Sequence, residues 1–328
     1  MNKLTKIGVS ALCGSLASVA AANAGSMDVT GAASATYTSL SDQVVGNPLG
    51  MTTALTFTGN GELDNGSTFK VTIAHGNKVA YSTSSIALTT PSLGTFTYDE
   101  GGGTGIDRID DMMPTAWEET DGTALPVGLR TVSGVGGVTD LEWNVGMGLP
   151  DGMNVYASFA PRPDGSQNTK KSSSGASTVG NGNGWDVVIT HSGLLDGLNV
   201  FAGYSSIDQN ATLGDKDSEA YGATYAIGGL TVGYQQSEED NVGAAATYYD
   251  TDAYAVSYSV NDDLTISYGI TESNTNSAST SDVEAQSFQI SYSVGGASLV
   301  FAESDVDNQN YVSGTNRSGR TVAVTLAF

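Results

Sequence analysis

Basic residues are scarce in this 328-residue sequence, which has 12 Lys and Arg against 35 Asp and Glu. Nucleic-acid binding needs clustered Lys and Arg side chains, so this shortage argues against a nucleic-acid partner. Charged residues of both signs make up only 14% of the chain, well below the roughly 25% that is usual in soluble domains. The acidic residues are scattered among Val, Ile, Tyr and Phe, which argues against a disordered acidic tail.

Cysteine is limited to Cys13, which lies in a segment typical of a secretory signal peptide. Lys3 and Lys6 give this segment a positive start, an apolar stretch follows, and Ala22-Asn23-Ala24 fits a small-x-small cleavage pattern. We expect residues 1–24 to be removed, which leaves a mature chain without cysteine, as suits an oxidising compartment. Beyond this segment no run of about 18 apolar residues occurs, which excludes a transmembrane helix.

Proline is scarce as well, with 7 residues against 42 glycines, and tyrosine is the commonest aromatic residue. This composition favours strands and tight turns over long helices. Short connections rich in Asn, Asp and Gly, such as residues 64–66 and 195–197, alternate with long polar ones such as residues 39–50 and 161–183. Between the connections about sixteen strands are expected, at residues 27–38, 52–61, 68–75, 84–90, 94–99, 138–147, 153–160, 184–191, 198–205, 220–227, 230–235, 251–260, 264–271, 285–294, 297–302 and 321–328.

An even number of strands with alternating short and long connections is the layout of an all-β transmembrane antiparallel barrel. We therefore expect one such barrel domain over residues 25–328. A lipid-facing charge near the bilayer midplane costs about 2–4 kcal/mol in these barrels. The expected strands carry no charge at the middle of their apolar face. Lys70, for example, opposes the apolar face of its strand. Glu303 and Arg320 share the apolar parity, so we expect them at the loop ends of their strands and most other acidic residues in loops or the lumen.

Aromatic residues recur at one level of the expected barrel. If odd-numbered strands run toward the cell exterior, seven of the eight end their apolar face in an aromatic residue, which suits the headgroup level of a membrane. The seven residues are Tyr37, Tyr98, Phe159, Tyr204, Tyr234, Tyr268 and Phe301. The alternative is a soluble β-sandwich, but that fold needs an apolar interior between two sheets, whereas one face of nearly every strand here is Thr, Ser, Asn or charged.

Two segments resemble the general outer-membrane porins of Gram-negative bacteria, and among them the alphaproteobacterial type. The end of the chain, residues 321–328, is similar to the terminal strand of that family. The family presents the last residue of this strand, here Phe328, to the barrel-assembly machinery. The long connection after the fifth strand, residues 100–127, contains Gly105-Ile106-Asp107-Arg108-Ile109-Asp110-Asp111-Met112-Met113-Pro114-Thr115-Ala116-Trp117-Glu118-Glu119 and resembles the loop that folds inward in porins. The resemblance implies a homotrimer in the cell outer membrane, surrounded by lipid, with a water-filled diffusion channel for ions and small hydrophilic solutes.

The residues of this connection are consistent with such a constriction loop. Connections as long as this one are uncommon unless they are functional or disordered. Apolar residues at helical spacing, from Ile106 to Trp117, predict a short helical turn that anchors the loop against the wall. The acidic residues would then stand where the pore is narrowest and raise the local cation concentration. They are Asp107, Asp110, Asp111, Glu118 and Glu119. The alternative is a solvated acidic loop outside the pore.

The basic half of the expected constriction departs from the family pattern. Porins set several arginines on the wall against the acidic loop, whereas few basic residues are available here, and Gly31-Ala32-Ala33 stands in the region of an early Tyr-Gly-Arg. We expect Lys70 and Arg130 as wall partners of the loop and Arg108 as an ion-pair partner inside it. A strong transverse field is therefore in doubt, and cation preference is favoured.

Enzymatic and metal chemistry find little support in the sequence. Only two histidines occur, His75 and His191, and both share parity with lipid-facing residues, as interfacial or subunit-contact residues would. No His/Cys cluster is present, so we expect no catalytic residues, cofactor or tightly bound metal. Asp215-Lys216-Asp217 and Asp305-Val306-Asp307 could hold Ca²⁺ loosely, or could simply be solvated. The expected function is passive transport; a substrate-specific channel and an adhesive or surface-structural barrel remain alternatives.

Overall fold

The structure is a computed structural model that describes residues 26–41, 46–77, 82–120, 125, 127–165, 180–243, 246–276 and 280–328. The expected signal peptide, residues 1–24, lies outside these ranges. Within them, no helix is long and apolar enough to cross a bilayer.

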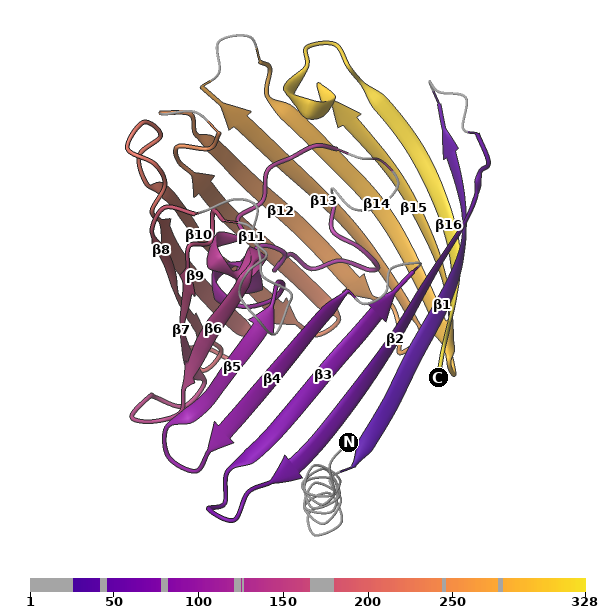
Figure 1. Ribbon diagram of the computed structural model, residues 1–328. Coiled ribbons are helices and arrows are strands. Elements are labelled where there is room, and N and C mark those ends of the chain that lie inside the picture. Colours follow the sequence, from indigo (N-terminus) through magenta and orange to yellow (C-terminus); the bar gives the residue numbers. More distant parts are fainter. Residues whose placement is uncertain are drawn as a thin grey trace, which may run out of the picture.

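The described residues form sixteen antiparallel strands that close into one barrel (Figure 1), in which neighbours in sequence are neighbours in space and β1 pairs with β16. The first eight are β1 Met27–Leu40, β2 Leu49–Glu62, β3 Thr68–Gly76, β4 Thr83–Thr90, β5 Gly94–Glu100, β6 Thr139–Val145, β7 Met153–Pro161 and β8 Asn183–His191. The others are β9 Leu198–Ile207, β10 Lys216–Ile227, β11 Leu230–Glu239, β12 Tyr249–Ser259, β13 Leu264–Thr275, β14 Val283–Val294, β15 Ala297–Asp307 and β16 Arg317–Ala327. The expected strand barrel is confirmed, and the sandwich alternative is wrong.

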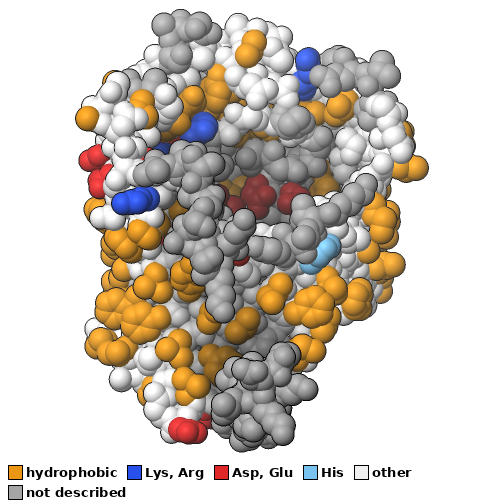
Figure 2. All heavy atoms as spheres, viewed as in Figure 1, with side chains coloured by type: hydrophobic (Ala, Val, Ile, Leu, Met, Phe, Trp, Pro, Cys, Tyr) orange, Lys and Arg blue, Asp and Glu red, His pale blue; other side chains and the backbone are white. Residues whose placement is uncertain are grey.

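Side chains alternate between the outside of the wall and the lumen, because successive residues of a strand point to opposite faces. On β8, Trp185 and Ile189 are 45% and 41% exposed, whereas Asp186 and Val188 are 1% and 0% exposed. Hydrophobic side chains cover the flank of the barrel in Figure 2, while Asp and Glu side chains lie in the hollow at its mouth. The barrel therefore has an apolar outside and a polar inside.

The seven aromatic residues expected in a girdle all lie on the outer face of the odd-numbered strands. Tyr37, Tyr98 and Phe159 are exposed, and Tyr204 and Tyr234 each stand beside an aromatic of the neighbouring even strand. The remaining two, Tyr268 and Phe301, follow the same outward parity, because they pair with Phe288 and Ile290 of β14. Their role at a membrane interface stays a prediction.

Several strands extend further than expected at the end of the barrel that carries the long connections. β10 begins at Lys216 rather than at residue 220, and β11, β13 and β15 continue to Glu239, Thr275 and Asp307. Backbone hydrogen bonds do not depend on apolar side chains, so the ladder continues through polar sequence. Most acidic residues other than Glu303 were expected in loops or the lumen, and this expectation is wrong for nine that lie on the outward parity of β10–β15. They are Asp217, Glu219, Glu238, Asp250, Asp252, Glu272, Glu284, Asp305 and Asp307.

Glu303 and Arg320 are likewise not at strand ends. They are direct cross-strand partners on the outer face, and Arg320 Nε donates to Glu303 Oε1 at 2.9 Å. Their mutual pairing compensates the two charges, which explains why both can occupy the parity of the apolar residues.

The chain terminus closes the seam between the first and last strands. Phe328 and Gly31 exchange two backbone hydrogen bonds of 2.9 and 3.0 Å. The Phe328 ring lies over Gly31, with Cζ only 2.7 Å from the point that a Cβ there would occupy. Gly31 therefore makes room for the Phe328 ring.

Candidate functional site: the lumen and its inner loop

The described residues of the connection between β5 and β6, 101–120, 125 and 127–138, lie inside the barrel and are called the inner loop here (Figure 1). The inner loop is longer than the expected connection, residues 100–127, because residues 128–138 return along the wall before β6 begins. Its contacts are with side chains of the inward parity, as detailed below. The alternative of a solvated loop outside the pore is therefore wrong.

The first turn of the inner loop is anchored by apolar side chains. Residues Gly105–Ile109 form a 3₁₀ helix, η1, in which Ile106 and Ile109 are both 0% exposed. They pack against Val188 and Phe201 of the inner wall. Burying each side chain away from lumenal water contributes about 1.5–3 kcal/mol. The expected helical turn is confirmed for these residues, whereas residues 110–120 are irregular; a second 3₁₀ helix, η2, follows at Gly134–Gly137.

Buried carboxylates of the wall hold the backbone of the same turn. Asp186 of β8 accepts from the N–H groups of Ile106 and Val135 at 2.9 and 3.1 Å, so it joins the beginning and the end of the loop. Asp140 accepts from the Thr104 hydroxyl at 2.9 Å. Glu142, also on β6, accepts from Gly105 N–H at 2.9 Å. These wall acids were not among the expected site residues.

The middle of the loop is fastened by neutral wall side chains. Ala116 N–H donates to Ser267 Oγ of β13 at 2.9 Å. Gln289 of β14, only 2% exposed, accepts from the N–H groups of Trp117 and Glu118 at 3.0 and 3.1 Å and donates to the Glu118 carbonyl at 2.7 Å. Further on, Leu125 packs in a cluster with residues of β14 and β15. The loop thus follows the inner wall from β6 to β15.

Arginines fasten both legs of the loop to the wall. Arg108 forms an ion pair with Glu142 and lies 4.0 Å from the centre of the Tyr156 ring. On the return leg, Arg130 Nη2 lies 3.2 Å from Glu239 Oε2, and Lys216 Nζ lies 2.7 Å from Glu239 Oε1. Both glutamates are 3% exposed.

The expected arrangement of an acidic loop against a basic wall is thereby reversed. Arg108 pairs with the wall and not inside the loop, because Glu142 lies directly beside η1. Arg130 belongs to the loop itself and pairs with a wall acid. Lys70 is an exposed inward residue near the start of β3, and the described part of the chain gives it no ion pair. Lys216 was not among the expected site residues. Its inward direction toward Glu239 follows from the start of β10 at Lys216, which the sequence pattern did not predict.

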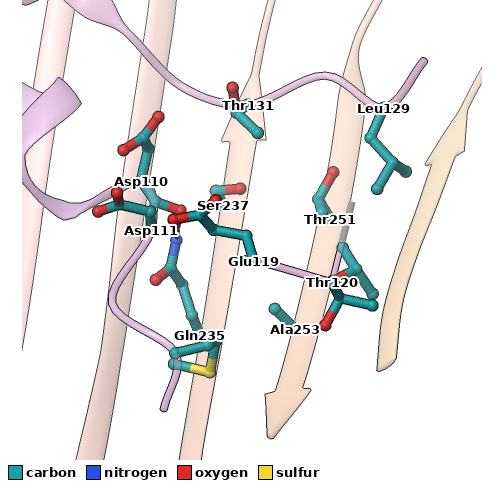
Figure 3. Close-up of a pocket in the computed structure, with 12 residues that line it drawn as sticks. Asp110, Asp111, Glu119, Thr120, Leu129, Thr131, Gln235, Ser237, Thr251 and Ala253 are labelled. Carbon is teal, nitrogen blue, oxygen red and sulfur yellow. Dashed lines mark hydrogen bonds between the residues drawn. The ribbon is translucent and has the colours of Figure 1, made fainter. Parts of the chain in front are cut away.

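Three of the five expected loop acids gather around one cavity of about 240 Å³ between the loop and strands β11–β13 (Figure 3). They are Asp110, Asp111 and Glu119. The wall side of the cavity carries uncharged polar groups, including Gln235, Ser237 and Thr251. Gln235 also holds the loop, because its Nε2 donates to the Asp110 carbonyl at 2.8 Å. The cavity can therefore accept cationic or neutral polar groups more readily than anions.

The other two loop acids lie away from this cavity and are half-buried. Asp107 Oδ2 accepts from Gly103 N–H at 2.7 Å. Burial raises the pKa of Asp107, and repulsion from Asp111 adds to the rise. Burial also raises the pKa of Glu118, with a further contribution from the neighbouring Glu119. Both groups therefore bind protons at a higher pH than an ordinary carboxylate does.

Among the described residues, no group of three or more His, Cys, Asp or Glu side chains is placed to hold a metal ion. In the first candidate Ca²⁺ segment, Lys216 points inward to Glu239 while Asp217 points outward. In the second, Val306 points inward between the outward Asp305 and Asp307.

A family model described as "Gram-negative porin" matches residues 8–311. The chain belongs to the Gram-negative porin family. A comparison with curated proteins found no match.

Solved porins share the fold of this porin at low sequence identity. OmpF of Salmonella typhi, in a complex with daunomycin, is 14% identical with a TM-score of 0.69 over 93% of this chain and 98% of that chain. An anion-selective porin from Comamonas acidovorans is 13% identical, with a TM-score of 0.64 over 93% and 100%. OmpT of Vibrio cholerae in its trimer form is 13% identical, with a TM-score of 0.65 over 93% and 99%.

Family and fold together identify the protein as a channel-forming porin of the Gram-negative outer membrane. The ion preference does not follow from the fold, since an anion-selective porin has the same architecture. It has to be argued from the charges of this lumen.

Proposed function

We propose that the protein is a passive, cation-preferring diffusion channel of the alphaproteobacterial porin type, in which the inner loop narrows the pore. The observation that carries this proposal is the reversed charge arrangement. Arg108 and Arg130 are each paired with a buried wall glutamate, while Asp110, Asp111 and Glu119 face the same cavity. Each arginine is offset by its glutamate, and the five loop acids outnumber the remaining lumenal cations Lys70 and Lys216, so the field in the lumen is negative and attracts cations.

The wall opposite the inner loop supports passage of small hydrophilic solutes. Inward positions of β1–β5 include Thr36, Thr56, Thr72, Ser85 and Thr97, which offer hydroxyl groups without charge. Such a surface exchanges hydrogen bonds with passing water and solutes without binding one solute tightly. This favours a general channel over a substrate-specific one.

A homotrimer is part of the proposal. On β2–β4 the outward residues near the height of the aromatic girdle are Met51, His75 and Ile86, and none of them is aromatic. We therefore assign the contact with another copy to these three strands. OmpT of Vibrio cholerae, a porin of this fold, has a trimer form. His75 is then a subunit-contact residue. The mass of the detergent-solubilised protein, measured by light scattering, tests this point.

The remaining expectations extend the proposal. Phe328 is the residue presented to the barrel-assembly machinery. Ca²⁺ binds at most loosely, at the outward Asp217, Asp305 and Asp307. The protein has no enzymatic activity. An adhesive or surface-structural role for the long outer connections is the rival function.

Reconstitution in planar bilayers tests the proposed function. In a KCl gradient the channel should open stably, and its reversal potential should have the sign expected for cation selectivity. Liposomes that contain the protein should admit small neutral sugars of different structure at rates that depend on their size. Selection of one sugar regardless of size would favour a substrate-specific channel. Anion selectivity would contradict the electrostatic argument, and lack of conductance would favour the adhesive role.

A further inference from the structure

The inner loop rests on wall positions that have no side chain. We infer that the inward glycines Gly203, Gly233 and Gly269 form a seat that positions the inner loop and thereby sets the width of the pore. This inference rests on the proposed narrowing role of the loop. The evidence for the seat itself is independent of that role.

Each glycine lies under a successive part of the loop. A Cβ at Gly203 of β9 would stand 2.9 Å from Ile109 Cδ1. A Cβ at Gly233 of β11 would stand 2.6 Å from Pro114 Cδ. Carbon atoms in contact normally lie about 3.5–4.0 Å apart, so a side chain at either position would displace the loop.

The third position follows the same order. A Cβ at Gly269 of β13 would collide with the Thr120 hydroxyl. The loop residues therefore advance along the chain in the same direction as the glycines advance around the barrel, on every second strand. The strand between the last two glycines presents Ala253 and Ala255, which are also small.

Backbone conformation does not explain these glycines. None of the three has a positive φ, so each would be compatible with an ordinary residue on that ground. Glycine also weakens a strand, because it loses more backbone entropy on folding than other residues do and has no side chain to pack. What the three positions share is the loop that fills the missing side-chain volume.

The sequence context locates the seat at one level of the barrel. Each of the three glycines is adjacent in sequence to a girdle tyrosine, in Gly203-Tyr204, Gly233-Tyr234 and Tyr268-Gly269. Because neighbouring residues point to opposite faces, the outward ring and the inward gap lie within one residue of each other in height. The loop thus follows a track parallel to the aromatic girdle.

The seat can be tested with a bump and a compensating hole. Gly203→Val adds volume beneath Ile109, and Ile109→Ala in the same chain removes volume above it. Gly76→Val is the matched control, because Gly76 is also inward, at the end of β3, and among the described residues its Cβ would meet only Ser82, at 3.6 Å. A chain starting at Gly25 contains no cysteine, so Val132→Cys, at a site that is 1% exposed beside Ile109, reports the loop position through thiol labelling.

We expect Gly203→Val to raise the labelling rate at position 132 about tenfold, because overpacking lifts the loop from the wall. Single-channel conductance should fall as the loop enters the pore. Adding Ile109→Ala should reverse both effects, and Gly76→Val should cause neither. If Gly203→Val fails to assemble, Gly203→Ala gives the same tests with smaller effects.

The outcomes separate the seat from the proposed function. Faster labelling with unchanged conductance would leave the seat standing and contradict the narrowing role of the loop. Unchanged labelling with unchanged conductance would overturn the seat. Failure of Ile109→Ala to restore either quantity would also overturn it, since the effect would then not arise from this contact.

Discussion

The proposed cation preference depends on single ionisable side chains. Among the described residues, Glu239 pairs with both Arg130 and Lys216, with contacts of 3.2 and 2.7 Å. Sequence analysis identified the acidic loop and its apolar anchors, because both depend on local spacing. It could not identify Glu142, Asp186 or Glu239 as loop partners, because their roles depend on which strand faces the loop across the barrel.

Glu239→Gln should reduce cation preference. The substitution keeps the shape of the side chain but leaves Arg130 and Lys216 without their compensating charge, and both then repel cations in the lumen. The measurement is the reversal potential in a KCl gradient, which should move toward zero. Glu303→Gln is the control, since Glu303 pairs with Arg320 on the outer face and the variant should keep the wild-type value.

Cation preference should also weaken as the pH falls, and earlier than ordinary carboxylates would allow. Raised pKa values mean that Asp107 and Glu118 take up protons above the usual range, near pH 4, so their negative charge is lost before that of ordinary carboxylates on acidification. Reversal potentials measured from pH 7 to pH 4 should decline in this upper range. In the double variant Asp107→Asn/Glu118→Gln, the decline in the upper part of this pH range should be missing. If that decline persists in the double variant, other groups cause it.

At the scale of elements, the inner loop is a structured part of the wall and not a free connection. Periodicity in the sequence predicted one helical turn, and this holds for residues 105–109. The return leg, residues 128–138, was not predicted, because its one helical turn, Gly134–Gly137, is short and glycine-rich and the rest of its backbone is irregular. The strand extensions were missed for a different reason: polar residues were taken as loops although the hydrogen-bond ladder continues through them.

Gln289→Ala should release the middle of the inner loop. It removes three hydrogen bonds to Trp117 and Glu118, each with a net value of about 1 kcal/mol. Amide hydrogen exchange at these two residues should accelerate by about tenfold or more. Gln286→Ala, on the outward parity of the same strand, should leave their exchange unchanged; equal acceleration in both variants would show a general loosening of β14.

At the scale of the whole molecule, closure of the barrel was the most predictable feature. Alternation of apolar and polar residues fixes which face meets lipid, and sixteen such strands leave few architectures. The seam between β1 and β16 was less predictable, because the fit of Phe328 onto Gly31 joins the two ends of the sequence.

Phe328→Ala should lower the yield of closed barrels. The ring covers Gly31 at the seam, and its loss opens a gap where the last strand docks. The fraction of folded protein can be read from heat-modifiable migration in electrophoresis, with Phe288→Ala as a mid-strand aromatic control. A larger loss in the control than in Phe328→Ala would contradict a special role for the terminus.

The proposed cation preference depends on the acids of the inner loop, of which Asp110, Asp111 and Glu119 gather around one lumenal cavity. The most direct test neutralises Asp110, Asp111, Glu118 and Glu119 together as Asn and Gln and measures the reversal potential in a KCl gradient beside the wild-type protein. The account predicts a clear cation-side potential for the wild type and a shift toward zero in the variant. An unchanged potential in the variant, or an anion-side potential in the wild type, would contradict it.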